Sequence, residues 1–152
     1  MRQFAPFQDL GATATCAQVA TYVTNVIKAA NASRVALNAM LKGQTLATAL
    51  DAYFSDPVSG GNEIGAPAPI AGVAIDRKKV CANPSTCSSY VDVSGAFGGA
   101  TSQTVGDILT YAASRSNPGG SAWYGQVKGT QELAKDTFDA INNQVAFGAT
   151  GR

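Results

Sequence analysis

Histidine is absent from the 152 residues of this chain, and charged residues make up only 14% of it. The imidazole ring is the side chain best suited to proton transfer near neutral pH, and it is the commonest metal ligand. Its absence excludes the Ser-His and Cys-His arrangements of the common hydrolases, and three cysteines alone cannot complete a structural zinc site. The composition therefore favours a structural or binding protein over an enzyme, and we expect no catalytic residue, cofactor or metal.

The chain also has no large excess of either charge. It contains eleven basic and ten acidic residues, so the net charge is +1. A nearly neutral chain has no field to attract nucleic acid, so we expect no nucleic-acid partner. The one basic run, Arg77-Lys78-Lys79, is predicted to be a solvated face. No window approaches the roughly 18 apolar residues that span a bilayer, so we expect no membrane insertion. The first seven residues lack the apolar core of a signal peptide, so the protein either acts where it is made or has lost its signal.

Cysteine is scarce, but two of the three cysteines are only six positions apart. Cys81 and Cys87 bracket a turn-rich segment between two strand-like runs, so they can close a small disulfide loop. Reduced thiols and a metal pair are the alternatives. A disulfide favours an oxidising compartment, and hence an extracellular or cell-surface location. Cys16 falls on the apolar face of a predicted helix, where we expect it to be buried.

Helical spacing of apolar residues dominates the first half of the chain. It extends over 16–30, with Thr13 or Thr15 as the cap. Two further helical stretches follow, one over 37–41 and one over 46–54, and the second ends at Asp56-Pro57. We expect a break between these stretches at Gly43, which gives either a helical hairpin or one long kinked helix. Because much of the apolar content is alanine, the core is expected to rest on a few large anchors. These are Leu50, Phe54, Leu109, Phe138 and Ile141.

The second half adds one β-hairpin and two helices. Residues 57–69 are rich in glycine and proline and are predicted to be a loop, and 71–94 alternate like an antiparallel hairpin closed by the cysteine loop. One helix is predicted after the cap Thr104, and another from about Thr130. We expect residues 1–152 to form a single domain of the α+β class, a helical bundle that is mainly α with one inserted antiparallel hairpin.

Exposed aromatic residues are the main candidates for partner binding. Residues 1–14 are predicted to be an irregular arm that either folds back on its own domain or docks on a neighbour. The Trp123-Tyr124 pair lies between glycines and is either a partner anchor or a plug between the last two helices. The predicted partner-binding residues are Phe4, Phe7, Leu10, Trp123 and Tyr124.

Acidic residues near the first loop leave two weaker hypotheses open. Asp51, Asp56 and Glu63 lie close in sequence, and paired carboxylates serve glycoside hydrolysis. A loop calcium site would use Asp56, Asn62 and Glu63, although they lack the alternating spacing of known calcium loops. We expect these carboxylates to be solvated surface groups.

The last third of the chain carries a family resemblance. Val105-Gly106-Asp107-Ile108-Leu109 and the segment from Glu132 to Asn143 resemble C-terminal helical segments of large bacterial cell-surface proteins. The resemblance implies secretion and display rather than catalysis.

We therefore expect a secreted or surface-exposed structural or adhesive subunit that acts by self-association or partner binding. In this hypothesis the arm packs into a groove on an adjacent copy, or a hairpin edge adds a strand to another chain, in a homo-oligomer or larger assembly. A virion or other particle coat or decoration protein is the first alternative. A small carboxylate-dependent enzyme is the second.

Overall fold

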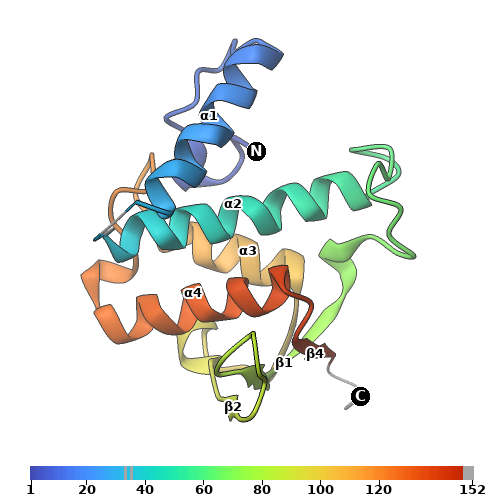
Figure 1. The fold of residues 1–152 in the computed structure, drawn as a ribbon, viewed down its shortest axis with the longest axis vertical. Helices are drawn as coiled ribbons and strands as arrows, with labels where there is room; N and C mark the ends of the chain where they lie inside the picture. The colour runs from blue at the N-terminus through green and yellow to red at the C-terminus, as the bar shows by residue number, and fades with distance from the viewer. Residues whose placement is uncertain (33, 35, 149–152) are drawn as a thin grey trace.

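The computed structural model describes residues 1–32, 34 and 36–148, which form four helices and a four-stranded antiparallel sheet (Figure 1). The helices are α1 (Cys16–Ala30), α2 (Leu37–Ser55), α3 (Val105–Ser114) and α4 (Lys128–Asn142). The strands are β1 (Ala74–Cys81), β2 (Tyr90–Val91), β3 (Ser102–Thr104) and β4 (Ala146–Gly148). The fold is thus α+β, and the predicted helical bundle is wrong because the sheet is larger than one hairpin.

Side-chain caps set where two of the helices begin. Thr15 forms a capping box with Gln18 at the start of α1, and Thr104 accepts a hydrogen bond from the backbone N–H of Asp107 at the start of α3. Both caps confirm the sequence prediction. α2 ends at Ser55, directly before Asp56-Pro57, as predicted.

The predicted break at Gly43 is wrong, because α2 continues through this residue without interruption. A Cβ atom at Gly43 would lie 2.6 Å from Cβ of Ala30 on α1. Because glycine has no side chain, α1 can approach α2 closely at this position. The same property made Gly43 look like a helix break in the sequence.

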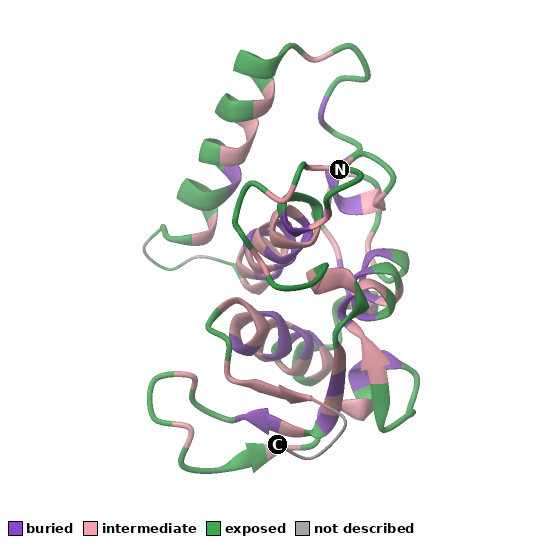
Figure 2. Cartoon of the chain, turned by 90° about the vertical axis from the view of Figure 1, so that its right-hand side faces the viewer, coloured by how far each residue is buried: buried purple, intermediate pink, exposed green. Residues whose placement is uncertain are grey.

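β1 is the central strand of the sheet. It pairs with β2 through Val80 and Val91, with β3 through Ile75 and Gln103, and with β4 on its other edge. β1 and β2 are the hairpin expected over 71–94. β3 and β4 were not predicted, because three residues are too few for a visible alternation. Figure 2 shows the sheet lying against α4, with α2 on the other side of that helix.

Arg77 is buried in β1, so the expectation that the whole basic run is solvated is wrong for this residue. Side chains alternate along a strand, and Arg77 points inward with Ile75 while Lys78 is exposed. Nη1 of Arg77 donates to the carbonyl oxygen of Phe97 (2.7 Å) and to Oε1 of Gln103 (2.9 Å). Burial lowers the pKa of Arg77, partly offset by the charge of Asp92.

The N-terminal arm folds back on its own chain. Its 3-10 turn, Ala5–Phe7, accepts a backbone hydrogen bond from Gly119 at the carbonyl oxygen of Ala5. Asp9 then binds Nζ of Lys42 on α2 (2.7 Å) and the hydroxyl of Tyr22 on α1 (2.6 Å). The arm is thereby fastened to two helices and to the loop that precedes Trp123.

Candidate binding sites

A cavity of about 630 Å³ lies between the N-terminal arm, α1, the end of α2 and the start of α3. We call it the arm groove. Its walls are mostly apolar, and the principal side chains are Phe4, Val19, Leu50, Tyr53, Phe54 and Leu109. Tyr53 and Phe54 pack edge to face with ring centroids 5.2 Å apart, and they are 48% and 37% exposed. Phe54 therefore lines a groove and is not the core anchor that the sequence predicts.

Two carboxylates, Asp56 and Asp107, are the charged side chains among the residues that line the arm groove, and Met1, which also lines it, carries an amino group. Asp107 accepts a hydrogen bond from Oγ1 of Thr104 (2.8 Å). Asp56 accepts from the hydroxyl of Ser59 (2.6 Å) and from the backbone N–H of Val58 (3.0 Å), and these bonds lower its pKa. The groove thus combines exposed aromatic rings with negative charge.

The five predicted partner-binding residues are not on one surface. Phe4 lines the arm groove, and Tyr124 lines a separate cavity beside Arg115. Phe7, Leu10 and Trp123 are buried, so in this structure their side chains are not available to an adjacent copy. Nε1 of Trp123 donates to the carbonyl oxygen of Gly120 (2.9 Å), as a buried indole requires.

Sequence reasoning missed Tyr53, Asp107, Tyr111 and Arg115, which line these two cavities. The signal was weak because Tyr53, Asp107 and Tyr111 occupy ordinary helical positions and Arg115 directly follows the end of α3. Only the packing of the arm and the loops around those helices turns them into cavity walls.

Of the residues proposed for a site at the first loop, Asp56 and Asn62 form local hydrogen bonds, and Glu63 is exposed. The side chain of Asn62 closes the loop through two hydrogen bonds to the backbone of Ala66, at 3.0 and 2.9 Å. Asp51 is half-buried on α2, and desolvation raises its pKa. Across the described residues no three His, Cys, Asp or Glu side chains gather as metal ligands would.

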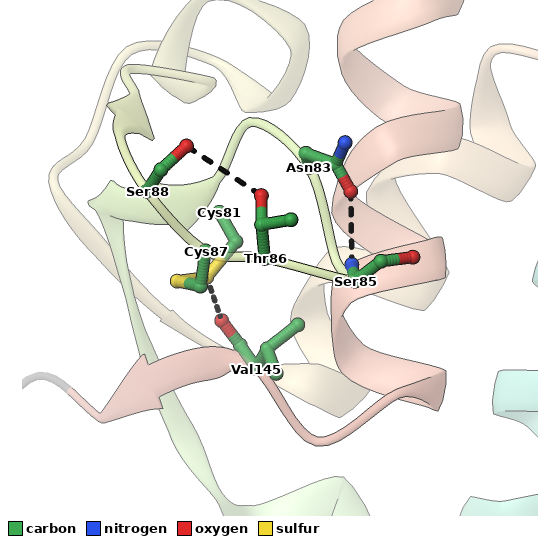
Figure 3. The surroundings of a disulfide bond; sticks show 7 residues. All are labelled: Cys81, Asn83, Ser85, Thr86, Cys87, Ser88 and Val145. Carbon is green, nitrogen blue, oxygen red and sulfur yellow. Dashed lines mark hydrogen bonds between the residues drawn. A yellow bond between two sulfur atoms is a disulfide. The ribbon is translucent and has the colours of Figure 1, made fainter.

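The disulfide between Cys81 and Cys87 is present, as predicted (Figure 3). It closes a loop that extends from the end of β1, in which Oδ1 of Asn83 accepts from the backbone N–H of Ser85 (2.9 Å). Cys81 is buried, and its sulfur lies 3.0 Å from the carbonyl oxygen of Val145, next to β4. The disulfide therefore closes the hairpin loop, and its Cys81 sulfur lies against the segment that leads into β4.

Cys16 is an exposed free cysteine, and the prediction of a buried side chain is wrong. It is the first residue of α1, and in that helix only Val26 is buried. The apolar periodicity of α1 is real, but most of the helix lies outside the core.

Within residues 1–32, 34 and 36–148, no helix has the length and apolar character needed to cross a membrane. The resemblance of the last third to bacterial cell-surface proteins stays a prediction. No protein family model matches this chain, and neither a curated protein nor a solved structure matches it.

Proposed function

We propose that this protein is an extracellular or cell-surface structural subunit that self-associates head to tail. In this proposal the arm groove of one copy receives the outer face of α1 from the next copy. The observation that carries the proposal is the arm groove itself, with two partly exposed aromatic rings and two carboxylates.

The chemistry of the groove restricts what it can receive. Apolar walls favour an apolar insert, because burial of apolar surface drives association. The two carboxylates, Asp56 and Asp107, outnumber the one cation of the groove lining, the amino group of Met1, so they favour an insert that carries a positive charge. An apolar segment with a single basic residue satisfies both requirements.

α1 has these properties on its outer face. Figure 1 shows that α1 projects from the body of the molecule above α2, and Figure 2 shows most of it exposed. Ile27 is 46% exposed, and the neighbouring Lys28 is the single charged residue in the helix. Amphipathic helices commonly bind partners by insertion into an apolar groove.

The proposed contact joins two different surfaces, so each copy offers one groove and one helix. Such a heterologous contact repeats from copy to copy and builds rings or filaments rather than a closed dimer. This is the behaviour of a structural or adhesive subunit. The disulfide supports assembly in an oxidising compartment.

Sedimentation velocity over a range of protein concentrations tests the proposal. We expect the sedimentation coefficient of the unmodified chain to rise with concentration, and Phe54→Ser to remain monomeric because it removes one aromatic wall of the groove. Val127→Ser is the matched control, since Val127 is 58% exposed and precedes Lys128 but does not line the groove. A wild-type chain that stays monomeric, or a Phe54→Ser variant that assembles like the control, would refute the proposal.

A further inference from the structure

A second cavity, of about 510 Å³, lies where the end of α3 meets the turn that follows Trp123. We call it the Arg115 pocket. Its side-chain walls are Tyr111, Ser114, Arg115, Ser116 and Tyr124. The 3-10 segment Ser94–Phe97 completes it with Gly95 and Ala96. This volume is ample for a ligand of the size of a monosaccharide or an acylated amino acid.

Arg115 is the one charged residue among the described residues that line this pocket. Its guanidinium lies 4.7 Å from the ring centroid of Tyr111, and Nη2 donates to the Tyr111 hydroxyl (3.0 Å). Stacking and hydrogen bonding together fix the plane of the guanidinium. None of the ion pairs among the described residues involves Arg115, so it retains N–H groups for a planar, bidentate acceptor.

Tyr124 brings a second donor to the pocket. Its hydroxyl oxygen is buried and has no hydrogen-bond partner among the described residues. Desolvation raises the pKa of Tyr124, so the hydroxyl keeps its proton at neutral pH. A buried donor without an acceptor is rare in native proteins, and a small rotation of the Tyr124 side chain toward the pocket would let a ligand oxygen satisfy it.

The backbone that carries Tyr124 is strained. Tyr124, Gly125 and Gln126 follow one another in the left-handed region, with φ of 51°, 59° and 65°. Residues other than glycine rarely adopt this conformation, and such strain gathers at ligand sites where the surrounding structure enforces it. Here the backbone N–H of Tyr124 donates to the carbonyl oxygen of Arg115 (2.7 Å), which holds the two residues side by side.

Positive charge also lies beneath the pocket. The buried guanidinium of Arg77 donates to the carbonyl oxygen of Phe97, the last residue of the 3-10 segment that completes the pocket. Asp92 precedes this segment, and its Oδ1 is occupied by the backbone N–H of Ser94 (2.9 Å). Arg115 is thus the charged residue of the pocket lining, Arg77 lies behind the 3-10 segment, and no carboxylate is among the lining residues.

We propose that the Arg115 pocket binds a small carboxylate. Arg115 forms the bidentate pair with the carboxylate oxygens, and the Tyr124 hydroxyl donates to one of them or to an adjacent ligand oxygen. The body of the ligand fills the space beside Tyr111 and Ser114. The site is separate from the arm groove and independent of self-association.

NMR titration of the full chain at constant pH tests this assignment, with probes in matched pairs. Glucuronate is compared with glucose, and N-acetylalanine with its amide. We expect the acids to shift the amide signals of 114–116 and 124–126 with millimolar affinity, and the neutral members of each pair to leave them unchanged. The acid that binds more tightly distinguishes a sugar body from a peptide body.

Two variants separate ligand binding from a structural role. We expect Arg115→Gln to weaken binding of the acids at least tenfold and Tyr124→Phe to weaken it about threefold. Tyr124→Phe is not expected to lower the thermal unfolding midpoint, because it removes an unpaired buried hydroxyl, and Tyr90→Phe is the exposed control. Equal shifts from acids and neutral probes, unchanged binding by Arg115→Gln, or a lowered midpoint in Tyr124→Phe would overturn the proposal.

Discussion

Gly43→Ala tests the close approach of α1 to α2, on which the projecting position of α1 depends. In an exposed helix interior this substitution stabilises a protein by about 1 kcal/mol. Here the new Cβ would lie 2.6 Å from Cβ of Ala30, whereas carbon atoms in favourable contact are about 3.5 to 4.0 Å apart. Overpacking of this kind costs about 1 to 3 kcal/mol, so we expect a net loss of about 1 kcal/mol.

Urea denaturation followed by far-UV circular dichroism measures this loss against a matched control. Gly129 lies in α4, where an added Cβ would meet no atom within 4 Å, so Gly129→Ala should be neutral or stabilising, and the two variants should differ by about 1 to 2 kcal/mol. Adding Ala30→Gly to Gly43→Ala removes the overlapping Cβ, so the double-mutant cycle should give a favourable coupling free energy. If Gly43→Ala is as stable as Gly129→Ala, or the cycle shows no coupling, the described packing of α1 on α2 is incorrect.

Two further stability predictions concern the arm and the disulfide. Hydrogen bonds from Lys42 and Tyr22 outweigh the effect of burial and lower the pKa of Asp9 below its ordinary value of 3.8. Asp9→Asn should therefore lower the free energy of unfolding by about 1 kcal/mol at neutral pH, a value that allows for the partial exposure of Asp9. Urea denaturation at several pH values should show that this difference from wild type shrinks as the pH falls below 3.8. A difference that does not change with pH would contradict the role of the Asp9 carboxylate. Loss of the disulfide in Cys81→Ser/Cys87→Ser should cost about 2 kcal/mol by loop entropy. Thermal unfolding that matches that of the oxidised wild type would show that the crosslink does not constrain the unfolded chain.

Local signals in the sequence predicted the features that depend on neighbouring residues. The caps at Thr15 and Thr104, the stop at Asp56 and the disulfide each depend on side chains within a few positions of one another. The strands β3 and β4 are three residues long and pair with β1 across many residues, so no local pattern marks them.

The sites were harder to predict than the helices because distant segments build them. Phe4 and Tyr124 were among the predicted binding residues, and each lines a cavity. The residues around each of them come from segments that are distant in sequence. Phe4 shares its cavity with residues of α2 and α3, and Tyr124 shares its cavity with residues of α3 and the 3-10 segment Ser94–Phe97. Arg77 was misassigned because the register of β1 decides which member of a basic run points inward.

Complementation between two variants tests head-to-tail self-association most directly. Ile27→Asp disables the outer face of α1 and leaves the arm groove intact, whereas Phe54→Ser disables the groove and leaves α1 intact. We predict by sedimentation that each variant alone is monomeric and that an equimolar mixture forms a one-to-one dimer, because one intact groove meets one intact helix. A mixture that remains monomeric while the wild-type chain assembles, or a single variant that assembles by itself, would contradict the account.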